Sequence, residues 1–229
     1  MPPKLSPAAE DYVKALYSLE SEAAAAGAEP AVNTTALAGR LEVSAASATN
    51  MIKKLEALGI VLYAPYRGAS LTDSGRRIAL EIVRHHRLIE TYLAQALGVP
   101  WDQLHAEAEV LEHALSEELE ERISAHLGHP TSDPHGHPIP TKEGDLPGEA
   151  FGSRRLWELA EGDAASIERV PDSEAETLRY LDELGMRPGA QVEVVGRGPV
   201  GGPLFLRLAN GDDEVRALSK ELAESVWVS

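Results

Sequence analysis

The feature that most constrains the fold is a series of short helical and β patterns in the first third of the chain. Two helix-like stretches joined by a turn precede two short β-prone stretches, at positions 34–41, 45–58, 60–63 and 69–71. In the second stretch Ala48, Ile52 and Leu55 recur at helical spacing, and Ser44 just before it is a favoured N-cap residue. The order predicts a helix-turn-helix followed by a β-hairpin, which is a winged helix.

The remainder of the chain changes from helical to β patterns. Ser6-Pro7 begins a predicted helix to about residue 25, and two longer helices are predicted over 72–97 and 101–127. Short β-prone runs follow after about residue 153, with turn signals at Pro188-Gly189 and Asn210-Gly211 and one helix at 173–184. The predicted fold is mostly α with a small C-terminal β-barrel.

These patterns predict four segments. They are a winged-helix domain at 1–75, a helical domain at 76–127, a Pro/Gly/His-rich linker at 128–152 and a β-barrel domain at 153–229.

Charge and composition limit the classes of protein. The net charge of −16 argues against a nucleic-acid partner, but residues 40–90 hold eight basic and five acidic residues, whereas 101–145 hold two and eleven. The chain has no cysteine, so disulfides and thiolate metal sites are excluded. No apolar run reaches membrane-spanning length and no signal peptide is recognisable, which predicts a cytoplasmic protein without a membrane partner.

The first turns of the second helix of the helix-turn-helix suit a major groove. Small and polar residues there can approach base edges, and Asn bonds adenine whereas Ala contacts the thymine methyl group. Basic residues further along the helix and at the hairpin tip suit phosphates. The candidate DNA-binding residues are Ser44, Ala46, Ser47, Asn50, Lys53 and Arg67. The alternative is a generic helical bundle with a polar surface.

Carboxylates and histidines recur at helical spacing in the two longer helices. His86 and Glu90 are four residues apart, and a second set comprises His105, Glu109, Glu112 and His113. Side chains three or four apart share a helix face, and uncompensated like charges there repel each other. A divalent cation removes that repulsion, and Asp11 of the first helix can close the site. The alternative is a solvated acidic face with incidental histidines.

Four further histidines, at 126, 129, 135 and 137, lie in or near the Pro-rich loop. We interpret them as exposed or hydrogen-bonding residues, although His-rich tracts also bind metals.

Together these segments resemble the diphtheria toxin repressor and manganese transport regulator family over essentially the whole chain. The resemblance rests on AEDYVKALYSL, LAGRLEVSAASATNMIKKLEALG, YRGASLTDSGRRIA, HHRLIETYL and HAEAEVLEHALSEELEERI, and on a C-terminal stretch similar to a FeoA-like barrel. It implies a homodimeric metal-dependent regulator, most simply a repressor of metal-homeostasis genes, that binds pseudo-palindromic operator DNA. No catalytic activity is expected.

The resemblance also implies the metal ligands. The primary site would comprise Asp11, Glu109, Glu112 and His113, and the ancillary site His86, Glu90 and His105, with Glu174 and Glu176 as barrel candidates. Ligands without sulfur suit Mn²⁺ or Fe²⁺, and the acidic residue at position 11 favours Mn²⁺. Lys14 stands where shorter manganese regulators carry a second acidic ligand, so two separated sites are expected rather than a two-metal cluster.

Other functions stay open at this point. An iron-responsive regulator of the same family fits the same ligand types. A helical di-metal carboxylate oxidase uses similar residues, although its Glu-x-x-His pairs are imperfect here. A winged-helix regulator that senses an organic ligand, or an acidic interaction module, are further alternatives.

Overall fold

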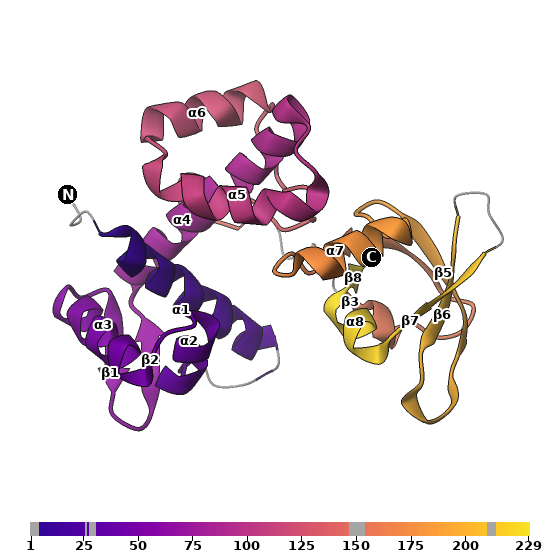
Figure 1. Ribbon diagram of the computed structural model, residues 1–229, viewed down its shortest axis with the longest axis horizontal. Coiled ribbons are helices and arrows are strands. Elements are labelled where there is room, and N and C mark those ends of the chain that lie inside the picture. The colour runs from indigo at the N-terminus through magenta and orange to yellow at the C-terminus, as the bar shows by residue number, and fades with distance from the viewer. Residues whose placement is uncertain (1–4, 26, 28–30, 147–153, 210–213) are drawn as a thin grey trace. The chain divides into compact units, whose positions relative to one another are not determined.

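The computed structural model describes residues 5–25, 27, 31–146, 154–209 and 214–229, which form two compact units (Figure 1). The first unit comprises Met1–His85 with Lys142–Gly144, and the second His86–Thr141 with Asp145–Ser229. The helices of four residues or more are α1 Pro7–Ala25, α2 Thr34–Arg40, α3 Ala45–Ala57, α4 Asp73–Tyr92, α5 Leu104–Leu111, α6 Glu117–His126, α7 Ala175–Glu183 and α8 Lys220–Ser225, with a π-helical turn η1 Leu93–Leu97.

The first unit is the predicted winged helix. Asn33 and Ser44 cap α2 and α3 by accepting hydrogen bonds from the amides of Ala36 and Ser47. The wing is the antiparallel pair β1 Val61–Ala64 and β2 Gly68–Leu71. The apolar faces of α1, α2, α3 and the wing share one core, as the helical spacing in the sequence predicts.

A buried carboxylate links α1 to the wing and to the start of α4. Glu20 is 3% exposed, and its Oε1 accepts a hydrogen bond of 2.7 Å from the amide of Leu71 at the end of β2. Its Oε2 accepts a second bond of 2.7 Å from the guanidinium of Arg76. A buried charge needs such partners, so Glu20 fixes the angle at which the wing meets α1.

The predicted single helix over 101–127 is wrong in one respect. The chain forms a short 3₁₀ turn η2 Trp101–Gln103, α5, a second 3₁₀ turn η3 Glu112–Ala114 and then a separate helix α6. Ser116 begins α6 as its N-cap, accepting from the amide of Leu119 at 3.3 Å. The apolar residues on the two sides of the break differ in burial, because Leu104 and Ala108 are buried whereas Leu119 is 48% exposed.

The C-terminal part is a six-stranded antiparallel sheet, a barrel only in the loose sense. Its strands are β3 Arg154–Arg155, β4 Ala164–Arg169, β5 Gln191–Arg197, β6 Leu204–Leu208, β7 Val215–Leu218 and β8 Trp227–Val228. Their order is β3-β8-β4-β5-β6-β7, so among the described residues the two edges do not close on each other. Strand β3 and helix α8 were not predicted, and the predicted Asn210-Gly211 turn lies outside the described residues.

The second unit has one main core that joins its helices to the sheet. Leu104 and Ala108 of α5 and Ile89 of α4 pack in the same cluster as Ile167 and Val194 of the sheet. This shared core fixes α4 and α5 relative to β4. No helix among the described residues combines the length and apolar character that a membrane crossing requires.

Candidate metal centre and DNA-binding face

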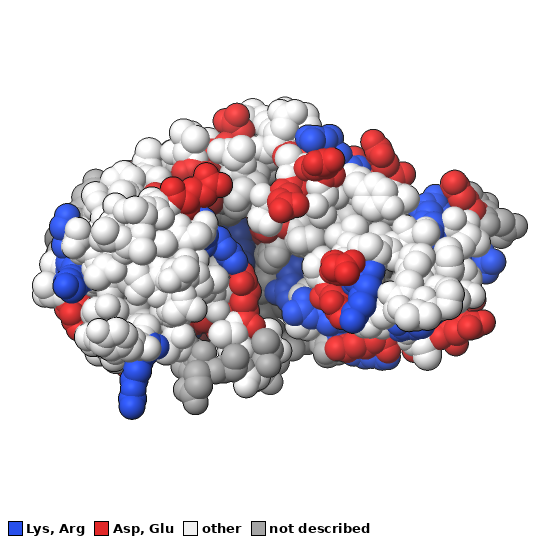
Figure 2. Space-filling model, turned by 60° about the horizontal axis from the view of Figure 1, so that its bottom comes forward, with Lys and Arg blue, Asp and Glu red and all other residues white. Residues whose placement is uncertain are grey.

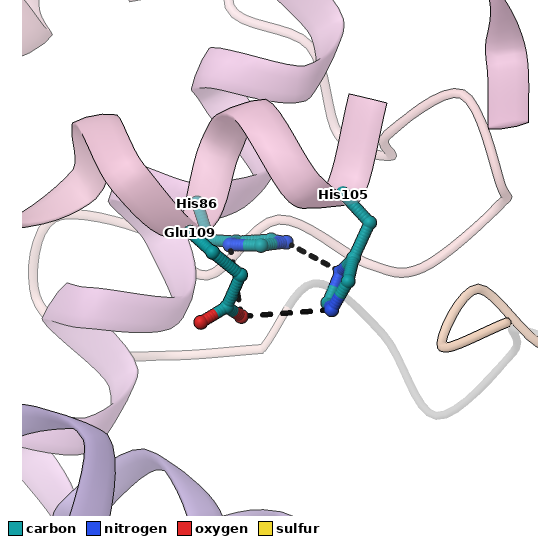
Figure 3. A group of neighbouring side chains, drawn as sticks. All are labelled: His86, His105 and Glu109. Carbon is teal, nitrogen blue, oxygen red and sulfur yellow. Dashed lines mark hydrogen bonds and ion pairs between the residues drawn. The ribbon is translucent and has the colours of Figure 1, made fainter. Parts of the chain in front are cut away.

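His86 is the centre of a cluster of carboxylates and imidazoles in the second unit. It lies on α4 and is 6% exposed. Its Nδ1 is 2.5 Å from Glu112 Oε2 and 3.8 Å from Glu109 Oε1, while its Nε2 is 3.1 Å from both Glu90 Oε1 and His105 Nδ1. Figure 3 shows His105 and Glu109 turned towards the ring of His86. His86, His105 and Glu109 therefore each offer one ligand atom, and the three atoms lie within 4.8 Å of one another.

A second group lies on the other side of Glu90. Glu90 of α4, Asp133 and His135 of the loop after α6, and Asp172 after β4 each offer a ligand atom within 4.8 Å of the others. Glu90 and His135 are fully buried and Asp133 is 5% exposed. The group again combines carboxylate oxygens with an imidazole nitrogen and contains no sulfur, a ligand set that suits Mn²⁺ or Fe²⁺.

The atoms of this second group lack the partners that buried polar groups ordinarily have. Glu90 Oε2, Asp133 Oδ2 and His135 Nδ1 are buried and accept or donate no hydrogen bond in the described part of the chain. The Nδ1 of His135 is 3.7 Å from Glu90 Oε2, too far for a hydrogen bond. Unsatisfied buried groups are costly, so the group fits a bound divalent cation that would engage these atoms.

The electrostatics of the group agree with that fit. Burial raises the pKa of Glu90, but the interactions with His105, His135 and His86 outweigh it and hold the pKa well below its usual range. Burial lowers the pKa of His135, yet Glu90, Asp133 and Asp172 outweigh burial and raise it. Burial raises the pKa of Asp172, which His137 and other neighbours bring below its usual range. The carboxylates of Glu90 and Asp172 are thus ionised and can hold a cation.

The loop that carries Asp133 and His135 is held in place by its own backbone and by the sheet. Asp133 Oδ1 accepts from the amides of His135 and His137 at 2.8 and 3.0 Å, which leaves Oδ2 for a ligand. The carbonyl of His135 accepts from the amide of Val170 at 3.0 Å. Gly136 has φ +88°, and a Cβ there would lie 1.9 Å from the carbonyl oxygen of Glu168. Only glycine permits this approach between loop and strand.

The structure places the predicted metal residues as follows. His86, Glu90, His105 and Glu109 converge in the second unit, and Glu112 joins them through His86. His113 Nε2 lies 3.8 Å from Glu112 Oε1 in the turn η3. Asp11 and Lys14 lie on α1 of the first unit, and the role of Asp11 stays a prediction.

Glu174 and Glu176 are exposed at the start of α7 and join none of the ligand groups formed by described residues. The hydroxyl of Thr177 donates to Glu174 at 3.2 Å.

Sequence reasoning missed three residues of the second group: Asp133, His135 and Asp172. Their spacing has no helical period, and His135 was assigned an exposed or hydrogen-bonding role. The available signal was the Asp-Pro-His triplet followed by Gly136, where an aspartate and a histidine two residues apart stand beside a glycine.

The candidate DNA-binding residues lie on one exposed part of the first unit. On α3 the residues Ala48, Ile52 and Leu55 are buried. Those proposed to meet DNA are all exposed: Ser44, Ala46, Ser47, Asn50, Lys53 and, at the wing tip, Arg67. Ser44 also caps α3, so its hydroxyl has a structural role besides any contact with DNA. On the face drawn in Figure 2, acidic and basic side chains are interspersed, so the net charge of −16 does not make the surface uniformly negative.

Three family models match consecutive parts of the chain. They are described as "Iron dependent repressor, N-terminal DNA binding domain" at residues 4–69, "Iron dependent repressor, metal binding and dimerisation domain" at 72–141 and "FeoA domain" at 154–229.

Known proteins resemble the chain over nearly its whole length. The iron-dependent repressor IdeR of Mycobacterium leprae is 32% identical over 96% of this chain and 95% of its own. A solved manganese-dependent transcriptional repressor in complex with manganese is 38% identical, with a TM-score of 0.85 over 96% of this chain and 99% of that one. The structure of ScaR with bound Cd²⁺ is 31% identical, with a TM-score of 0.79 over 96% and 98% of the two chains.

Proposed function

This chain belongs to the family of metal-dependent transcriptional repressors that includes the diphtheria toxin repressor and the manganese transport regulators, and we propose that it represses metal-homeostasis genes in response to Mn²⁺. The family consists of regulators rather than enzymes, so the oxidase alternative is set aside. As a regulator of transcription the protein acts on DNA in the cytoplasm.

We propose two cation sites per chain. The first comprises Glu109, Glu112 and His113, to which the family resemblance adds Asp11. The second comprises Glu90, Asp133, His135 and Asp172. His86 and His105 lie between the two sets and contact both through Glu90 and Glu109. The observation that carries the proposal is that three ligand atoms of the second set are buried and have no hydrogen-bond partner among the described residues.

Mn²⁺ is the proposed ion because every candidate ligand is a carboxylate oxygen or an imidazole nitrogen. A bound cation supplies positive charge that neutralises the clustered carboxylates. The solved manganese-dependent repressor supports this choice, as it is similar over almost the whole chain. Fe²⁺ is the second candidate, favoured by the likeness to IdeR, an iron-dependent repressor.

We propose that the active form is a homodimer on pseudo-palindromic DNA, since the chain matches a dimerisation domain. Four large apolar side chains in the helical part of the second unit are exposed, and we assign them to the dimer face: Leu97, Val110, Leu111 and Leu119. Such exposed apolar groups are typical of interfaces. Two recognition helices about 34 Å apart would then read successive major grooves.

The test begins with selection of DNA from a random pool by the Mn²⁺-loaded full-length protein. Affinity for the selected site is then measured by fluorescence anisotropy with Mn²⁺, with anaerobic Fe²⁺ and with chelator. Because metal and DNA favour the same state, each raises the affinity for the other. We expect Mn²⁺ to strengthen DNA binding at least tenfold (~1.4 kcal/mol). Equal affinity with chelator would show that the metal switch is wrong, and a response to Fe²⁺ alone would favour the iron regulator.

Variants separate the two proposed sites. Glu109→Gln probes the first, Asp133→Asn the second, and Asp11→Asn the ligand assigned by resemblance. Loss of a group that supports a metal ligand typically costs about 10- to 100-fold in affinity, and we expect at least that for a ligand itself. Glu107→Gln is the matched control, because Glu107 is exposed on the same helix as Glu109 and joins none of the ligand groups. Metal binding is measured by isothermal titration calorimetry.

A further inference from the structure

Two arginines flank one tryptophan in the C-terminal sheet. Trp227 of β8 is paired with Arg155 of the neighbouring strand β3 and with Arg169 of β4 on its other side. Directly paired residues in a sheet share a face, so the three side chains form a row. The guanidinium carbons lie 3.5 Å and 4.6 Å from the centroid of the Trp227 ring.

These two guanidinium groups differ from every other cation that stacks on an aromatic ring within the described residues. Arg187 over Trp101 pairs with Asp182, Arg197 over Trp157 donates to two backbone carbonyls, and Lys220 over the same ring lies 3.5 Å from Glu224. Arg76 over Tyr17 pairs with Glu20. The guanidiniums of Arg155 and Arg169 have neither an ion pair nor a hydrogen bond with any described residue.

Among the described residues, no direct ion pair therefore balances the positive charge of this row. Burial, together with the neighbouring cations Arg87 and Arg155, lowers the pKa of Arg169 to about 10, against the opposing effect of Asp133 and Asp172. Burial also lowers the pKa of Arg155, although Glu158 and Glu224 oppose this. Each guanidinium carries five N–H donors, and the row places one such fork on each side of Trp227 in the sheet.

We propose that Arg155, Trp227 and Arg169 form an oxyanion site that takes a phosphate group. A guanidinium engages phosphate through two parallel N–H···O bonds, and stacking on the indole holds its plane while leaving the N–H edges available. Two forks suit a doubly charged tetrahedral anion better than a single carboxylate. None of its three residues is a candidate metal ligand or a candidate DNA contact, and the site would make the C-terminal sheet a sensor of a small anion.

The experiment follows the indole N–H resonances of the three tryptophans in full-length, metal-free, ¹⁵N-labelled protein. Trp227→Phe assigns the signal of Trp227. Inorganic phosphate is the probe, titrated at constant ionic strength against chloride and acetate. We expect a saturable shift of the Trp227 signal that phosphate causes and chloride does not, and we expect acetate to act at least tenfold more weakly.

Variants test the row itself. Arg155→Gln and Arg169→Gln are each expected to weaken phosphate binding at least tenfold. Arg155→Lys and Arg169→Lys keep the positive charge but lose the forked guanidinium, so we expect their phosphate affinities to lie between those of the wild type and the glutamine variants. Arg187→Gln is the control, because it removes an arginine stacked on a different tryptophan. The amide spectrum of each variant reports whether the chain is folded, and a lysine variant replaces any glutamine variant that is not.

Three outcomes would overturn the proposal: no saturable shift at millimolar phosphate, equal shifts with chloride, or unchanged affinity in both arginine variants. A final titration distinguishes the source of the phosphate group. If a DNA duplex shifts the Trp227 signal at a lower concentration of phosphate groups than inorganic phosphate requires, the site is supported and its ligand is the nucleic-acid backbone.

Discussion

At the scale of single residues, the metal centre depends on side chains that each have two roles. His86 contacts Glu112 through Nδ1 and both Glu90 and His105 through Nε2, so one ring connects the two ligand sets. Asp133 uses one carboxylate oxygen to fold its loop and keeps the other for a ligand. In each side chain, one contact fixes the orientation, and the other nitrogen or oxygen atom is then placed to contact the candidate ligand set.

The raised pKa of His135 predicts a pH-dependent response to metal. A ligating imidazole must be neutral, so Mn²⁺ competes with the proton that Glu90, Asp133 and Asp172 stabilise on His135. In the metal-free protein a raised histidine pKa gives stability below the unfolded pKa, and this is lost as pH rises through the folded pKa. We expect the melting temperature of the metal-free protein to fall, and its increase with Mn²⁺ to grow, between about pH 6 and 8.

Thermal melts with and without Mn²⁺ check this expectation, with His126→Gln as the control because His126 is exposed at the end of α6. A gain in melting temperature on adding Mn²⁺ that is the same at every pH would contradict it.

At the scale of elements, the helical period of α3 places its packing residues on one face and its candidate DNA contacts on another. Its buried face holds the helix against α2 and the wing, and its exposed face carries the candidate DNA contacts. The two faces are expected to respond differently to substitution, since one contributes stability and the other affinity.

Asn50→Ala is expected to weaken operator binding by about 1–3 kcal/mol if Asn50 reads a base pair, and to relax sequence preference there. Lys53→Ala, at a proposed phosphate contact, should instead weaken binding to all sequences and reduce the slope of log affinity against log salt by about 1. Anisotropy titrations over a range of salt concentrations measure both. Lys220→Ala makes the same charge change in α8 of the other unit, and an equal effect there would refute the assignment.

Glu20 connects α1, the wing and α4 in a way that stability measurements can test. Glu20→Ala leaves the amide of Leu71 without its acceptor and Arg76 without its partner. A buried donor left unsatisfied costs about 1–3 kcal/mol, and we expect a loss of that size in the free energy of unfolding. Urea denaturation measures it. Glu20→Gln keeps an acceptor for Leu71 and should cost less; equal losses would show that the amide bond contributes little.

At the scale of the whole molecule, assembly and metal response are separate properties. The proposed metal ligands other than Asp11 belong to the second unit, and the exposed apolar residues proposed for the dimer face are a different set of residues in that unit. Val110 is 73% exposed on α5, one residue after the proposed ligand Glu109. Substitution of Val110 therefore tests assembly without removing a ligand.

Val110→Lys is expected to shift the dimer towards monomer, because a charge at an apolar interface is costly to desolvate. Sedimentation velocity across a concentration series measures the shift, and calorimetry checks that Mn²⁺ still binds. Leu146→Lys is the control, an exposed apolar residue far along the chain from the helical part. A dimer unaffected by Val110→Lys would remove this residue from the interface.

By itself the sequence determined the kinds of elements and the chemistry of the ligands. Helical spacing, the capping serine Ser44 and the β-prone wing predicted the winged helix, because these signals act between residues a few positions apart. The same local spacing brought His86 and Glu90, and His105 and Glu109, onto shared faces.

Tertiary structure alone decided which distant residues complete the candidate metal centre. Asp133, His135 and Asp172 reach Glu90 only because the sheet packs against α4 and α5 and the loop passes close to β4 at Gly136. Residues separated by some 40 to 80 positions have no spacing that predicts their meeting. Their convergence is a property of the packed core, whereas the nature of each ligand is a property of the chain.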